Sequence, residues 1–142
     1  MSLASRSAWS SDRAYADGSF IVVMVTGAFL AESAAVVNNK LDVSGGVLSG
    51  YLVGPDRTAR VVLVVLTQAE TDGPVRHVEV EIRPPGDGEP QHLVYDLPDA
   101  AASGEIGFAY FNIEVDLPCD GRWVFVVTCG PGVVSLPLQV SG

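Results

Sequence analysis

The stretch Val75 to Arg83, VRHVEVEIR, alternates apolar and polar residues from His77 to its end. Val78, Val80 and Ile82 share one parity, and the histidine, the two glutamates and the final arginine share the other. A period of two is typical of a strand with one buried and one solvated face. The stretch therefore predicts an antiparallel sheet whose wet face carries carboxylates.

Similar segments occupy most of the remaining chain and are separated by Gly, Pro, Asn and Asp residues, which favour turns. Since none of the intervening segments is long enough for a crossover helix, we expect the strands to pair antiparallel. About seven to nine such strands in one domain predict an all-β, immunoglobulin-like antiparallel β-sandwich. We predict a flexible tail over residues 1–18 and a single sandwich domain over residues 19–142. The strands are predicted over residues 20–30, 47–53, 59–68, 75–83, 91–97, 105–117, 122–129 and 133–140, with a tight hairpin between residues 36–37 and 41–43.

Four of these strands carry local predictions. The continuous apolar runs at residues 20–31 and 59–66 are typical of strands at the centre of a sheet, buried on both faces. The alternation over residues 105–117 changes phase between Tyr110 and Phe111, which predicts a β-bulge or a bend there. Pro137 cannot donate a hydrogen bond, so the last strand is expected at an edge, or with the Pro137 nitrogen facing outward.

Composition excludes some partners and locations. The formal net charge of −9 repels phosphate groups, so we expect neither nucleic acid nor an anionic membrane as a partner. The run at residues 20–31 is too short to span a bilayer. We interpret it as a buried strand; the alternative is a signal peptide over about residues 20–34. Cys119 and Cys129 flank one predicted strand, too far apart for a disulfide, and reduced thiols favour the cytoplasm.

The residues that carry chemistry are few and scattered. His77 and His92 are the only histidines, and both are predicted on solvated strand faces, where they would face each other across a hairpin. Such a pair would bind a metal or titrate near neutral pH, but isolated surface histidines are far more common. The loop carboxylates lack the spacing of a calcium loop. We therefore predict no catalytic residue, no cofactor and no metal. These carboxylates are Asp42, Glu114, Asp116 and Asp120.

Five short motifs between residues 28 and 140 resemble those of an uncharacterised bacterial β-sandwich family. The chain departs from the family pattern at Val47 and Leu48, where the family has Gly and Trp. The resemblance implies an immunoglobulin-like fold and lends no function. The motifs are Leu30-Ala31-Glu32-Ser33-Ala34, Asn39-Lys40-Leu41, Gly45-Gly46, Gly121-Arg122-Trp123 and Leu136-Pro137-Leu138-Gln139-Val140.

Together these observations favour a non-enzymatic interaction or structural module over an enzyme. We predict a protein partner or self-association, in which an exposed edge such as residues 133–140 pairs with a second copy. The alternative is a domain that binds a small ligand or carbohydrate through aromatic residues, namely Tyr51, Tyr95, Tyr110 and Trp123. The predicted interaction surface includes Tyr51, His77, His92 and Pro137.

Overall fold

Strands make up most of the described chain, which in the computed structural model comprises residues 22–70, 77–98, 101 and 106–142. The predicted all-β fold is confirmed. Val is the commonest residue in several strands, as its branched side chain suits a pleated surface. The strands described are β1 (Val22–Ala31), β2 (Ser33–Val37), β3 (Lys40–Ser44), β4 (Gly50–Leu52), β5 (Thr58–Glu70), β6 (His77–Arg83), β7 (Gln91–Asp96), β8 (Ile106–Asp116), β9 (Gly121–Cys129) and β10 (Gly132–Ser141).

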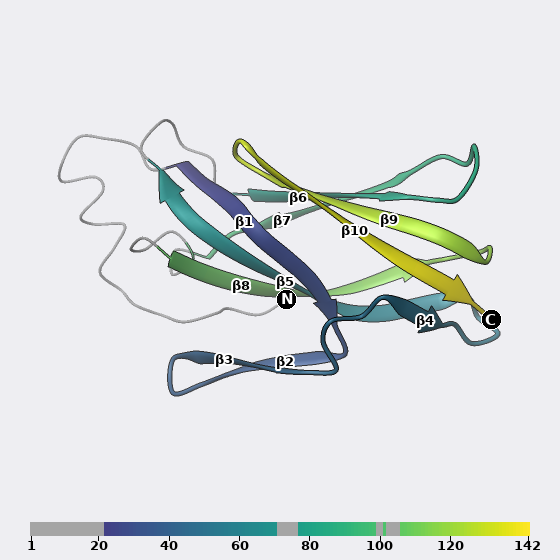
Figure 1. Ribbon diagram of the computed structural model, residues 1–142, viewed down its shortest axis with the longest axis horizontal. Coiled ribbons are helices and arrows are strands. Elements are labelled where there is room, and N and C mark those ends of the chain that lie inside the picture. Colours follow the sequence, from purple (N-terminus) through teal and green to yellow (C-terminus); the bar gives the residue numbers. More distant parts are fainter. Residues whose placement is uncertain (1–21, 71–76, 99–100, 102–105) are drawn as a thin grey trace.

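Two sheets face each other and form the predicted sandwich (Figure 1). One sheet has the strand order β1-β5-β8, and the other has the order β4-β10-β9-β6-β7. The expectation of purely antiparallel pairing is wrong at one place, since β4 runs parallel to the last residues of β10. No crossover helix connects these two parallel strands, because most of the chain between them forms β5 to β9.

The core lies between the sheets and is built from one face of each. Trp123, Phe111 and Phe125 are its largest fully buried side chains. The Trp123 Nε1–H donates to the Cys119 carbonyl oxygen at 2.9 Å, so the polar atom of this buried ring is satisfied. The expected alternation of β6 is confirmed, with Val78, Val80 and Ile82 in the core.

The outer face of the three-stranded sheet is also covered. The neighbours of Val62 and Val64 along β5 point into the core, so these two side chains point to the opposite face of the sheet. Both are nevertheless buried. The β2–β3 hairpin lies on this side of the sheet (Figure 1) and turns at Asn38 and Asn39, both at positive φ, as a tight hairpin requires. The prediction of a central strand is confirmed for β5 but wrong for β1, which lies at the edge of its sheet among the described strands. Its apolar outer residues reflect the hairpin instead.

Strand β8 has one uninterrupted phase. Its pairing with β5 is continuous from Asp116 to Ile106, and its burial alternates from Gly107 to Val115. The bulge expected between Tyr110 and Phe111 is therefore wrong. Aromatic residues occupy both faces of β8, and this produced the apparent change of phase.

Strand β4 pairs with β10 only at residues 139–141, so β10 is interior to its sheet there, and among the described strands its earlier residues, Pro137 included, remain at an edge. The edge prediction therefore holds for the part of the strand that contains Pro137, and the outward-nitrogen prediction fits as well. Gln139 N donates to the Ser49 carbonyl on the β4 side, away from β9. Since N–H groups alternate in direction along a strand, the nitrogen of Pro137 also faces away from β9. The proline therefore removes no hydrogen bond from the β9–β10 ladder.

The two sheets approach closely where β10 begins. Strand β1 has a register shift between Val25 and Gly27, and Gly132 lies against the Val25 carbonyl oxygen, so closely that a Cβ on Gly132 would overlap it. Nearby, the Cys129 thiol donates to the Val23 carbonyl oxygen at 3.1 Å. Backbone contacts thus fix the start of β10 against β1.

Replacing Gly132 by Ala should destabilise the protein by about 1–3 kcal/mol, because the added methyl group forces the sheets apart. Gly50→Ala is the matched control, since its Cβ would lie 3.6 Å from the nearest atom, an ordinary contact. It should change stability by less than about 1 kcal/mol. Urea unfolding measures both, and equal free energies of unfolding for the two variants would contradict the close approach of β1 and β10.

Candidate interaction site

The four residues predicted to form an interaction surface lie apart. Tyr51 on β4 is half-buried against the core, and its hydroxyl oxygen accepts a hydrogen bond from Arg60 N at 3.2 Å. His77, His92 and Pro137 are exposed on β6, β7 and β10. Tyr51 thus faces the core, whereas the other three side chains are exposed on three different strands.

The expected histidine pair is wrong. His77 lies opposite Asp96, and His92 lies opposite Glu81, so the register places the two rings towards opposite ends of the β6–β7 ladder. Each ring faces a carboxylate instead, with His77 Nε2 3.2 Å from Glu79 Oε2 and His92 Nε2 4.0 Å from Glu81 Oε2. Both contacts are exposed to solvent and contribute little to stability.

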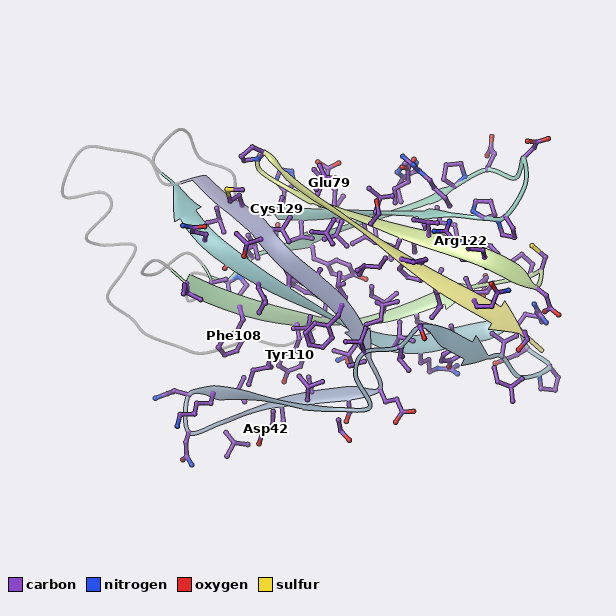
Figure 2. All side chains as sticks on the ribbon, in the orientation of Figure 1. Asp42, Glu79, Phe108, Tyr110, Arg122 and Cys129 are labelled. Atoms are coloured by element: carbon purple, nitrogen blue, oxygen red, sulfur yellow. The ribbon has the colours of Figure 1, made fainter. Side chains whose placement is uncertain are left out.

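The acidic residues considered for calcium binding are dispersed. Asp42 lies on the β2–β3 hairpin, away from the sandwich (Figure 2). Glu114 pairs with Arg60 at 2.8 Å, and Asp120 pairs with Arg57 at 2.9 Å. Within the described residues, no group of three His, Cys, Asp or Glu side chains is placed to hold a metal ion.

The aromatic residues considered for sugar stacking also belong to different places. Trp123 is in the core, and Tyr95 stacks on Phe111 at the side of the sandwich, with ring centroids 4.8 Å apart. Burial raises the pKa of Tyr95. Tyr110 lies on the opposite face of β8 from Phe111. These rings do not form a shared surface.

A shallow groove runs over the outer face of the five-stranded sheet, with a volume of about 380 Å³. Val126 and the exposed side chains of Val94 and Val133 contribute its apolar lining. Its polar lining includes Glu81, which accepts a hydrogen bond from Arg83 Nε at 2.8 Å. The ionic groups of this lining are largely satisfied by one another.

The outer edge of β8 is a candidate site that the sequence reasoning missed. Leu117 N donates to the Arg57 carbonyl oxygen, and these residues continue the register of the β5–β8 ladder. Odd-numbered residues of β8 therefore bond to β5, and even-numbered residues direct their N–H and C=O groups away from it. The side-chain amide of Gln91 confirms this direction, since it donates to the outward Asp116 carbonyl oxygen at 2.8 Å.

We use the name β8 edge for the outward backbone N–H and C=O groups of β8 between Ile106 and Glu114. Among the residues that the structure describes, no strand pairs with this edge. The strand contains neither Pro nor a basic residue, and its register has no bulge. Those are the devices that usually protect an edge from pairing with another chain. The β8 edge consists of the backbone N–H and C=O groups of Ile106, Phe108, Tyr110, Asn112 and Glu114.

Apolar side chains lie beside the β8 edge on the outer face of its sheet. Ile106 is 82% exposed and Leu66 is 38% exposed. Phe108 and Tyr110 are half-buried and point towards the side of the sheet where the hairpin lies (Figure 2). The hairpin thus covers the middle of this face and leaves an apolar margin at one end. The phase change in the sequence was the available signal for this margin.

No protein-family model, no curated protein and no solved structure matches the chain. The resemblance to a bacterial β-sandwich family therefore stays a prediction. In the described residues there is no helix of the length and apolarity that crossing a membrane requires.

The two thiols differ in burial. Burial raises the pKa of Cys129 to about 11, and the thiolate is the reactive form, whereas Cys119 is exposed. Iodoacetamide at pH 8 should modify Cys119 in the folded protein and Cys129 only after unfolding. Mass spectrometry with and without denaturant measures this, and rapid labelling of both thiols in the folded protein would contradict the burial of Cys129.

Stability should also fall as pH rises from about 9 to about 11. The folded state keeps the Cys129 proton up to a pKa of about 11, above the ordinary value of 9.0. Between these values the unfolded chain binds fewer protons, so the free energy of unfolding decreases with pH. Urea midpoints across this range should fall less steeply for Cys129→Ala than for the unmodified protein. Equal slopes of the urea midpoint against pH for the two proteins would show that a group other than the Cys129 thiol causes the loss of stability.

Proposed function

We propose that the protein is a non-enzymatic protein-interaction module, which accepts a strand from a partner along the β8 edge. The β8 edge is the observation that carries this proposal. Its five outward backbone positions form a regular row, with apolar side chains beside it. Main-chain hydrogen bonds give affinity in such strand addition, and side chains of one parity give specificity.

The other described edges are less suited to pairing. Strand β1 has a bulge, and Gly132 lies against it. Strand β4 spans only Gly50–Leu52, and β7 spans Gln91–Asp96. The part of β10 that extends past β4 contains Pro137. We therefore place the interaction at β8, in preference to the strand expected from the sequence.

We also propose that the sandwich is immunoglobulin-like. Assigning β1, β5 and β8 to strands A, B and E, and β6, β9 and β10 to C, F and G, fits both the chain order and the strand pairing. In constant-type immunoglobulin domains a strand D continues the sheet that contains A, B and E. Among the described strands none occupies this position beside β8. A partner's strand would take that place.

An interaction module has more support than the other classes considered. The histidines and the loop carboxylates are dispersed over separate strands and turns, so the described residues lack an assembled nucleophile and base. Sugar stacking has less support, because Trp123 is in the core and Tyr95 is stacked on Phe111. Strand addition requires none of these side chains.

Amide hydrogen exchange tests the proposal through residue parity. A short peptide of alternating Thr and Val should slow the exchange of the amides of Phe108, Tyr110 and Asn112, which point outward. The amides of Ala109 and Phe111 should change little, because they already bond to β5. Exchange followed by NMR at increasing peptide concentration measures both sets.

The matched control is the same peptide with Pro at alternate positions, which has fewer N–H donors for pairing. It should slow none of these amides. The proposal fails if no strand-forming peptide, and no strand of another protein molecule, slows amide exchange at the even-numbered residues of β8 more than at the odd-numbered ones.

A further inference from the structure

We infer that the strand accepted by the β8 edge is β8 of a second copy, running antiparallel about a two-fold axis at Tyr110. This inference rests on the proposed function and names its partner. Each copy offers five outward backbone positions from Ile106 to Glu114, because the Asp116 carbonyl is already bonded to Gln91. The symmetric pairing that uses all five positions is centred on the middle one, Tyr110.

The side chains on the outer face tolerate this register. It places Ile106 opposite Glu114, Phe108 opposite Asn112, and Tyr110 opposite its own copy. No like charges face each other directly, and aromatic pairs across strands are favourable. Glu114 is already paired with Arg60 of its own chain at 2.8 Å. The edge is therefore complementary to itself, as a two-fold interface requires.

On the inner face of β8, core side chains lie next to the same two-fold axis in each copy. Its residues nearest the axis are Ala109 and Phe111, both in the core. A twisted sheet extends in this way without a change of layer. The three-stranded sheet of each copy would join the other at β8, and the apolar margins of the two copies would become one surface.

Net charge opposes this association at long range. Each chain carries a formal charge of −9, and two such chains repel each other at low ionic strength. Salt screens this repulsion over a distance of about 8–10 Å at physiological concentrations. Backbone hydrogen bonds and apolar contacts are less sensitive to salt. The dimer should therefore be favoured by raising sodium chloride.

Light scattering after size exclusion measures the association. The unmodified chain should approach twice its 14.9 kDa mass as its concentration rises from micromolar to millimolar. Asn112→Pro should remain monomeric, because its outward N–H is lost while the bonds to β5 are kept. Asn112→Ala is the matched control and should still dimerise. Circular dichroism checks that each variant is folded.

A disulfide tests the register, independently of the proline variant. In a Cys119→Ser background, Tyr110→Cys should give a covalent dimer on oxidation with diamide. Hydrogen-bonded partners in an antiparallel pair have Cα atoms about 5.5 Å apart, within the range for a disulfide. Glu114→Cys should give none, because the two Glu114 positions would lie about 27 Å apart along the strands.

The inference is overturned by a chain that stays monomeric at every concentration and salt, or that cross-links equally at Glu114 and Tyr110. If the monomer still shows slowed even-residue amides with the Thr-Val peptide, only the identity of the partner fails. If those amides exchange slowly in the monomer alone, another part of the same chain occupies the edge. In that case the proposed function fails as well.

Discussion

Strand β5 is apolar on both faces, and the architecture depends on the need to cover both. Leu63 and Val65 enter the core between the sheets, while Val62 and Val64 are equally buried on the opposite face. Burial of one such side chain stabilises the fold by about 1.5–3 kcal/mol, so an uncovered face would be costly. The five-stranded sheet covers the first face. The β2–β3 hairpin lies over the second, and the result is three layers.

This third layer explains which parts of the fold the sequence predicted. Strands with one solvated face, such as β6, were predicted with the correct inward residues, because their alternation depends on one interface alone. The two strands that flank β5 on the hairpin side, β1 and β8, were predicted less well. Phe108 and Tyr110 lie on the hairpin side of β8, which is partly covered, so aromatic side chains are favourable there. In the sequence, such residues on the outer face disturb the alternation in the same way as a β-bulge does. The same cause made β1 resemble a central strand.

The candidate site was less predictable than the fold, because it depends on register and strand order. A histidine pair across β6 and β7 required His77 to face His92, but the loop from residue 84 to residue 90 sets a register that pairs them with Asp96 and Glu81. Pro137 correctly indicated a nitrogen without a ladder partner. It did not indicate that β4 would pair beyond it. Which strand remains uncovered is decided by long-range pairing that no local pattern encodes.

The protection of the edges is uneven, and this gives β8 its significance. A bulge interrupts β1, a proline interrupts the exposed part of β10, and β4 is too short to be an extended template. In β8 the charged side chains, Glu114 and Asp116, lie at one end, leaving the stretch from Ile106 to Asn112 uncharged. Since exposed edges favour association, this contrast with the edges of β1, β4 and β10 is the reason we propose β8 as the strand that a partner pairs with. In that proposal, the high negative charge limits partners to surfaces with enough hydrogen bonds and apolar area to overcome the repulsion.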